Sequence, residues 1–199
     1  MKLRISHLAL LCLLSLSLLP ARADDDTYNP IAVGLRWLAD VTMTTPDGRT
    51  VQGKAIREIT GTEVINGKTY FTSVSKVDGI PLFKPFTTYR RKTAEGVFAI
   101  SASDPKKLEY LETALPLAVG KTWEVSSDKG RMFFTVEAQE AVTVGKVKYE
   151  KCFKLAYRAE GTPFSGHFHL APNVGNVTET MKVGAATLIF TNQSFTTPK

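Results

Sequence analysis

The sequence predicts an all-β protein in which about twelve short antiparallel strands, in two duplicated units, form a barrel, a half-barrel or a sandwich. Three observations predict this class: one motif occurs twice, short alternating segments are separated by turn residues, and no segment outside the N-terminus keeps a helical apolar period over three turns. Strands at such regular spacing, divided by turns, are typical of sandwiches and barrels.

The N-terminus has the three parts of a secretory signal peptide. Lys2 and Arg4 supply positive charge, residues 8–19 form an uncharged apolar run, and Ala21 and Ala23 give a small-x-small cleavage pattern. The run is shorter than the roughly 20 apolar residues that span a membrane. We therefore expect residues 1–23 to be a signal peptide and residues 24–29 a short N-terminal tail. The mature protein would then be periplasmic or secreted.

The charge of the mature chain is mild. The 199 residues carry a net charge of +6, which falls to +3 without residues 1–23, because that segment has three basic and no acidic side chains. The remaining basic residues are scattered, so we expect no nucleic-acid partner. No later segment approaches the length of a membrane span. Cys152 is left as a single cysteine, and we expect its thiol to be sheltered in the core.

The duplication begins with the motif Pro-(Ile/Leu)-Ala-Val-Gly-x-x-Trp, which occurs at residues 30–37 and again at 116–123. Two further matches follow in the same order, residues 63–68 with 141–146 and residues 89–97 with 168–176. Three ordered matches indicate a diverged internal repeat. We expect repeat 1 at 30–113 and repeat 2 at 116–195, together in one pseudo-symmetric domain.

Turn chemistry and alternation predict the strands within each repeat. Pro46-Asp47-Gly48 and Asn66-Gly67 are turn signatures, and the second is a strong signal for a type I′ hairpin. Residues 147–157 alternate apolar and polar side chains, interrupted at Lys151, as in a strand with one buried face. Residues 104–117 come nearest to a helical pattern and are expected to form a short helix or a linker.

Part of the chain resembles a group of uncharacterised exported bacterial β-rich proteins. The resemblance depends on the Pro-Leu-x-Val-Gly-x-x-Trp start at residues 116–123, the strand around Cys152, and the Ala-Pro-x-Val-Gly segment at residues 171–175. Asn173 stands where that group has glycine, and asparagine tolerates a positive φ. The resemblance implies an exported or envelope-associated β fold, and it implies no activity and no catalytic residues.

The repeated motif has a structural and a functional interpretation. We favour the structural one, in which Gly permits a bend and Trp37 and Trp123 close the ends of the scaffold, because tryptophan buries a large apolar area. In the alternative, Trp37 and Trp123 form an aromatic platform for a ligand. Tyr89 and Arg90, next to further basic residues, are a second ligand-binding candidate, for an anionic lipid or polysaccharide.

His167 and His169 are candidate metal ligands, because alternation places both imidazoles on one face of a strand. Zinc needs three or four ligands, and only Cys152, Glu160 or Glu179 remain as further candidates. No catalytic residue is predicted, since the chain has no Gly-x-Ser-x-Gly motif and no phosphate-binding glycine loop. We expect no cofactor.

Three functional hypotheses follow. The first is an exported, non-enzymatic binding or carrier protein for a small apolar or amphipathic ligand or an envelope partner, since small barrels often hold such ligands. The second is a metal-dependent envelope enzyme that uses His167 and His169. The third is a structural or adhesive module. The identity of the ligand, the strand order and the oligomeric state are left open.

Overall fold

The computed structural model describes residues 27–127 and 130–197, so the predicted signal peptide and residues 24–26 of the predicted tail lie outside the described residues. The described residues form twelve strands and no α-helix. The strands are β1 (Arg36–Thr44), β2 (Thr50–Ile65), β3 (Lys68–Asp78), β4 (Phe86–Lys92), β5 (Gly96–Ser101), β6 (Tyr110–Ala114), β7 (Thr122–Ser127), β8 (Gly130–Val144), β9 (Val147–Ala159), β10 (Phe164–Ala171), β11 (Gly175–Val183) and β12 (Ala186–Thr196). The predicted all-β class and strand number are confirmed.

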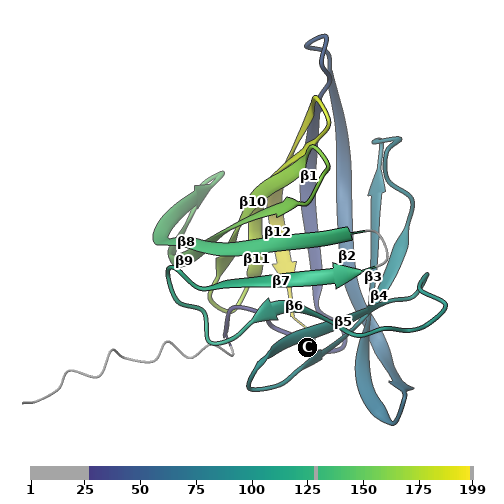
Figure 1. The fold of residues 1–199 in the computed structure, drawn as a ribbon. Helices are drawn as coiled ribbons and strands as arrows, with labels where there is room; N and C mark the ends of the chain where they lie inside the picture. Colours follow the sequence, from purple (N-terminus) through teal and green to yellow (C-terminus); the bar gives the residue numbers. More distant parts are fainter. Residues whose placement is uncertain (1–26, 128–129, 198–199) are drawn as a thin grey trace, which may run out of the picture.

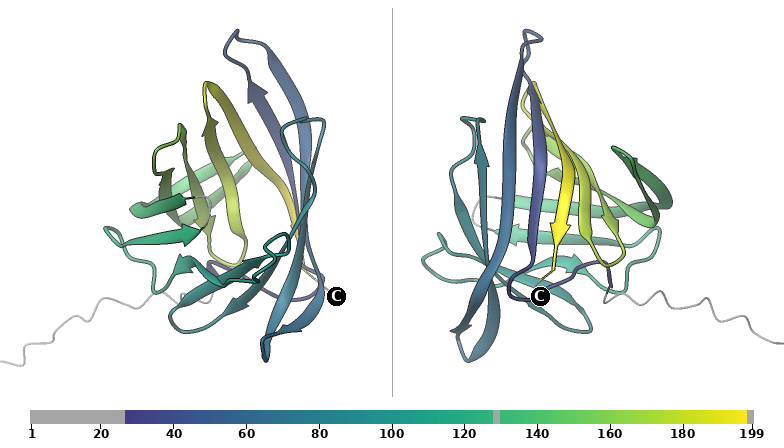
Figure 2. Two further views of the ribbon diagram at one scale, coloured as in Figure 1. Left: turned by 45° about the vertical axis from the view of Figure 1, so that its right-hand side comes forward. Right: turned by 180° about the vertical axis from the view of Figure 1, so that it is seen from behind.

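All twelve strands belong to one antiparallel sheet with the order β6-β5-β4-β3-β2-β1-β12-β11-β10-β9-β8-β7. Each half is a meander, and the first strand of one half, β1, pairs with the last strand of the other, β12. The sheet coils on itself and brings β6 and β7 toward each other on the side away from β1 (Figures 1 and 2). The architecture is therefore a nearly closed barrel, which decides between the three forms that the sequence left open.

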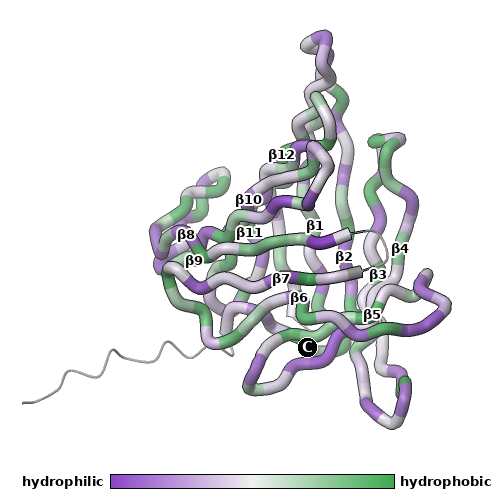
Figure 3. Tube along the Cα trace, in the orientation of Figure 1, coloured by the Kyte–Doolittle hydropathy of each residue, from purple (hydrophilic) through white to green (hydrophobic). Residues whose placement is uncertain are grey.

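Alternation along the strands gives the sheet its two faces, and Figure 3 shows hydrophobic positions interspersed with hydrophilic ones along the barrel. On the inner face, Val136, Leu155 and Leu170 belong to one buried cluster, and Val41 and Leu188 to another. Among the described residues no helix is long and apolar enough to cross a membrane.

The repeated motif builds the same turn in both halves. Gly34 has a φ of 89° and Gly120 a φ of 88°, a region in which glycine is favoured. The Gly34 amide donates to the Ile59 carbonyl at 2.8 Å, and the Gly120 amide donates to the Val136 carbonyl at the same distance. The turn thus ties the start of β1 to β2 and the start of β7 to β8.

Two further turn expectations agree with the structure. Asn66 and Gly67 have φ values of 51° and 74°, as the two central residues of a type I′ hairpin turn require. Asn173 has a φ of 62°, so it takes the positive-φ conformation expected of it in the Ala-Pro-x-Val-Gly segment.

For residues 104–117 the sequence left open a short helix or a linker, and the short helix is wrong. The Asp104 carboxylate accepts hydrogen bonds from the amides of Lys106 and Leu108, each at 2.9 Å, which closes a turn instead of starting a helix. Residues 110–114 then form β6, because the edge of the sheet beside β5 offers backbone partners that outweigh a weak helical pattern.

The interruption at Lys151 is a bulge. Lys151 has a φ of 56°, and the pairing of β8 with β9 shifts between Glu140 and Val142. The bulge turns Cys152 into a buried cluster with Val144, and its thiol is 0% exposed. The expectation that Cys152 is sheltered is confirmed.

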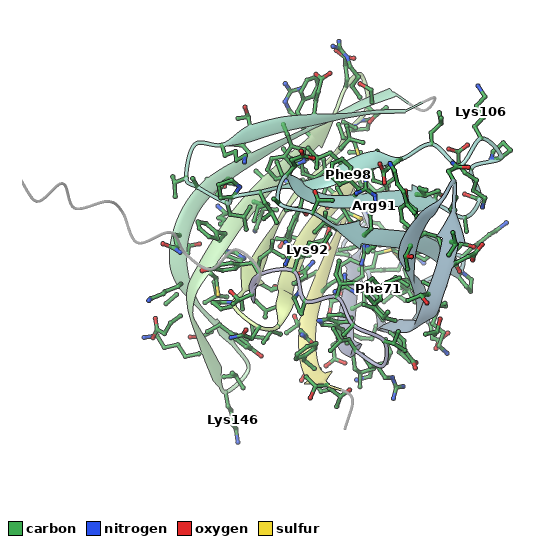
Figure 4. The ribbon with its side chains drawn as sticks, turned by 90° about the horizontal axis from the view of Figure 1, so that it is seen from below. Phe71, Arg91, Lys92, Phe98, Lys106 and Lys146 are labelled. Carbon is green, nitrogen blue, oxygen red and sulfur yellow. The ribbon has the colours of Figure 1, made fainter. Side chains whose placement is uncertain are left out.

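Residues 27–31 pack across one end of the barrel. Tyr28, within the predicted tail, is 2% exposed, and its hydroxyl donates to the Lys151 carbonyl at 2.8 Å. The Lys92 ammonium donates to the Asn29 carbonyl at 3.3 Å (Figure 4 labels Lys92 beside this segment). The segment therefore joins both halves before β1 begins.

Candidate ligand-binding site

The interior of the barrel is hollow. It contains a cavity of about 410 Å³ and a second of about 210 Å³. The two share seven lining residues and therefore adjoin as one lumen; the shared residues are Trp37, Arg57, Ser75, Phe86, Asn176, Glu179 and Met181. Both halves of the chain contribute to the wall of each cavity.

The wall is mainly apolar and aromatic, because the inward-facing positions of the strands carry such residues. The wider cavity is lined by Val125, Met132, Phe134, Phe164, Phe168 and Leu170 from the second half, and by Ile59 and Val97 from the first. The narrower cavity is lined by Ala39, Ala55, Val77, Phe83 and Phe190. A concave, mostly apolar site with a few polar groups is typical of small-molecule binding.

Arg57 lies where the two cavities meet. Its guanidinium carbon is 4.0 Å from the centre of the Trp37 ring, a cation–π contact, and the indole Nε1 of Trp37 donates to the Val174 carbonyl at 2.6 Å. The Nε of Arg57 is buried and has no hydrogen-bond partner. Burial lowers the pKa of Arg57 to about 9, and the positive charge of Arg90 lowers it as well, so the group is still a cation at neutral pH.

Glu179 is held by two neutral donors. The Tyr157 hydroxyl donates to Oε1 at 2.7 Å, and the Asn176 amide donates to Oε2 at 3.2 Å. Burial raises the pKa of the Glu179 carboxyl, against these hydrogen bonds and the positive charge of Arg57, which lower it. Burial, followed by the charge of Glu179, also raises the pKa of Tyr157.

A glycine makes room for Tyr157. Gly166 on β10 pairs with Tyr157 on β9, and a Cβ at Gly166 would collide with the Tyr157 hydroxyl and the Thr180 carbonyl. The missing side chain lets the phenol cross β10 and reach Glu179 on β11. The polar group of the lumen thus depends on a local packing feature of three adjacent strands.

Arg90 and Glu112 form the other polar group, with an ion pair of 2.6 Å between Nη2 and Oε1. Both side chains are mostly buried and line the wider cavity. Burial, together with the negative charge of Glu112, raises the pKa of the neighbouring Tyr110 to about 12. The lumen therefore combines apolar walls with two arginines, one lysine and two carboxylates, which suits a molecule with both apolar and polar parts.

The four ligand-binding candidates from the sequence occupy different places. Trp37, 6% exposed, and Arg90 line the lumen. Trp123 is half-buried, stacks on Phe134 at 5.1 Å and 4°, and lines neither cavity. Tyr89 packs on a buried cluster with Ile65 and also lies outside the lumen. Trp37 and Trp123 therefore do not face one common groove.

Sequence reasoning missed Arg57, Glu112 and Tyr157, and it named Glu179 as a possible metal ligand but not as part of a ligand-binding site. A signal existed for Arg57, because in β2 it lies in line with Ala55 and Ile59, which face inward. A charged residue in an inward-facing series is unusual and points to a polar site. Nothing in the sequence indicated that Glu179 and Tyr157 would meet.

His167 and His169 lie on the other face of β10. Their ring centres are 6.0 Å apart, and the Nε2 of His169 lies 2.9 Å from the Glu140 carboxylate. Of the further ligands considered, Cys152 is in an apolar cluster, Glu160 pairs with Arg131, and Glu179 lines the lumen, where it accepts from Tyr157. Over residues 27–127 and 130–197, no three His, Cys, Asp or Glu side chains are grouped closely enough to hold a metal ion.

Similarity to known proteins is confined to the fold. No protein-family model matches the sequence, and no curated protein matches it. A candidate exported protein with a YmcC-like fold from Bacteroides fragilis superposes with a TM-score of 0.52 at 12% identity, over 86% of this chain and 99% of that one. This likeness shows a shared barrel-like fold.

Two further solved structures have lower scores. A β-barrel-like protein of the domain of unknown function DUF1849 from Brucella abortus has a TM-score of 0.45 at 12% identity, over 84% of this chain and 99% of that one. A candidate lipoprotein from Parabacteroides distasonis has a TM-score of 0.39 at 10% identity, over 85% of this chain and 98% of that one.

Proposed function

We propose that the protein is an exported binding or carrier protein that holds an apolar or amphipathic ligand in the lumen of the barrel. The observation that carries the proposal is the hollow interior: cavities of about 410 and 210 Å³ adjoin, with apolar walls supplied by both halves. A barrel used only as a scaffold would fill such space with side chains, because protein interiors are close-packed.

The edges of the sheet support access to this lumen. Tyr110 and Glu112 on β6 and Val125 on β7 line the wider cavity. These two strands are the ends of the sheet, and the described residues form no ladder between them. A ligand can therefore enter where the barrel is open without breaking backbone hydrogen bonds.

Export is supported by the signal-peptide pattern of residues 1–23 and by the description of the Bacteroides fragilis protein that shares the fold. Fractionation of the producing cells tests this part of the proposal. We expect the processed chain in the periplasm or the medium, and full-length chain in the cytoplasm would contradict it.

Binding is tested with the neutral probe N-phenyl-1-naphthylamine, whose fluorescence rises in an apolar site. We expect saturable binding by the wild-type protein. The substitution Met181→Trp adds a large side chain to a residue that lines both cavities, and it should reduce probe affinity by about tenfold or more.

The matched control is Ile189→Trp on the neighbouring strand β12, where the side chain is exposed and points away from the lumen. This variant should bind the probe as the wild type does. No saturable binding, or equal binding by both tryptophan variants, would favour a structural or adhesive module.

A further inference from the structure

Arg57 differs from the other charged side chains of the lumen in having no partner. Lys76 pairs with Asp78 at 2.9 Å, Arg90 pairs with Glu112, and Glu179 accepts from Tyr157 and Asn176. For Arg57, the part of the chain that the structure describes offers the Trp37 ring but no hydrogen bond or ion pair. Its Nε–H donor is therefore buried without an acceptor, in a residue that lines both cavities.

The second half shows that the fold does not need a cation at this position. Trp37 on β1 is directly opposite Arg57 on β2, and Trp123 on β7 is directly opposite Phe134 on β8. The two pairs follow the same motif turn, and in the second half the phenyl ring of Phe134 stacks on the tryptophan. In one half a phenyl ring packs on the tryptophan, and in the other half a guanidinium does. Packing on the tryptophan therefore does not require a positive charge, and we look for another role for the charge of Arg57.

An unpaired buried guanidinium is costly, because water no longer solvates its charge fully. A ligand that brings an anion to Arg57 would replace the missing interaction, and charge-assisted hydrogen bonds from arginine to a carboxylate or phosphate are among the strongest in proteins. A cationic ligand would instead meet repulsion from Arg57, whereas the charge of Arg90 is compensated by Glu112.

The position of Arg57 orients such a ligand. The side chain lines both cavities, and the narrower one is mainly apolar, with Ala39, Val77 and Phe190 in its wall. The wider one holds Tyr110 and Glu112 and extends to the open edge of the barrel. An apolar chain fits the narrower cavity while its polar end stays at the junction.

We propose that the ligand of the lumen is an amphiphile with an anionic headgroup, which Arg57 binds while the apolar chain occupies the narrower cavity. This inference rests on the proposed function and adds the chemistry of the ligand. The headgroup can be a carboxylate or a phosphate ester, since both accept hydrogen bonds from a guanidinium in the same way.

The test is displacement of N-phenyl-1-naphthylamine by ligands with the same twelve-carbon chain, used below their micellar concentrations: dodecanoate, dodecyl phosphate, dodecanol and dodecyltrimethylammonium. For the wild type we expect the better of the two anions to bind about tenfold or more tightly than dodecanol, as a charged hydrogen bond would supply. Dodecyltrimethylammonium should bind more weakly than dodecanol. The better anion identifies the headgroup.

The decisive variant is Arg57→Phe, which reproduces in the first half the tryptophan–phenyl pair of the second. It should bind dodecanol as the wild type does and lose the preference for the anion. The control Arg49→Gln removes an exposed arginine of the β1–β2 turn, which pairs with Asp47, and should keep the preference. Circular dichroism checks that both variants are folded.

The outcomes separate this inference from the proposed function. If the probe and dodecanol bind but the anions bind no better, or if Arg57→Phe keeps the preference, the inference is overturned and the carrier proposal stands. If neither the probe nor dodecanol binds, the carrier proposal fails first. Should Arg57→Phe not fold, the order of the four ligands on the wild type still decides the inference.

Discussion

The barrel has two seams at which its halves meet, and they are built differently. At the first seam β1 pairs with β12 from Arg36 opposite Thr196 to Thr44 opposite Thr187. At the second seam the equivalent strands, β7 and β6, lie at the two ends of the sheet without a ladder between described residues. The two halves are thus joined by a ladder at one edge and by none between described residues at the other.

Strand length and connection explain the difference. β1 and β12 have nine and eleven residues and belong to opposite ends of the chain, so they align freely. β6 and β7 have five and six residues and are joined by the short segment 115–121, where the second motif turn must also fit. The open seam borders the wider cavity, so the weaker edge is also the one next to the candidate site.

The largest effect is expected from a leucine-to-alanine substitution at the closed seam, compared with the same type of substitution at the open seam. Leu188 on β12 is 0% exposed, and Leu188→Ala should lower the free energy of unfolding by about 2–5 kcal/mol, because it leaves a cavity in a close-packed cluster. Leu111 on β6 is half-buried, and Leu111→Ala should cost about 1 kcal/mol. Urea unfolding measures both; equal losses would mean that both seams are equally part of the core.

The second prediction concerns what holds β6 in place. Glu109, directly before β6, accepts hydrogen bonds from Tyr70 at 2.6 Å and from Arg91 at 2.7 Å, with a further, closer contact to the Arg91 Nε. The Arg91 guanidinium also lies over the Phe98 ring at 4.6 Å, and Figure 4 labels these two neighbours. These contacts lower the pKa of Glu109 to about 2, with the hydrogen bonds from Arg91 the largest cause.

Because the folded pKa is below the ordinary 4.5, this stabilisation is present above about pH 4.5 and is lost as the pH falls toward 2. Glu109→Gln should therefore destabilise the protein by about 1–3 kcal/mol at pH 7, and the gap from the wild type should close toward pH 2. Asp40→Asn at the closed seam, which breaks an exposed pair with Lys54, should cost less than about 1 kcal/mol at pH 7. A pH-independent gap for Glu109→Gln would contradict the assignment.

The smallest effect needs no substitution. Amides of β1 are bonded on both sides, to β2 and β12, whereas β7 is bonded only to β8. Amide hydrogen exchange followed by NMR should be about tenfold or more slower for β1 than for the β7 amides that point toward β6, because those have no backbone acceptor in the described ladders. Equal protection would indicate that the second seam closes in solution.

Local chemistry made much of the fold predictable. The alternation, the Asn66-Gly67 turn and the two motif glycines each act over a few residues, so their conformations can be derived from the sequence. The bulge at Lys151 and the strand at residues 110–114 could not be derived in this way. Both depend on a neighbouring strand that supplies backbone partners from elsewhere in the chain.

For the candidate site too, some features follow from local sequence properties and others only from long-range contacts. By itself the sequence determined an all-β chain of about twelve strands with a motif at the start of each half, since periodicity and turn preferences are local properties. Only the tertiary structure decided that one seam closes and the other does not, that Trp37 and Trp123 face different surroundings, and that Arg57 meets the lumen without a partner. The physical reason is that strand pairing and cavity formation depend on which distant residues come together, and β1 and β12 are separated by almost the whole chain.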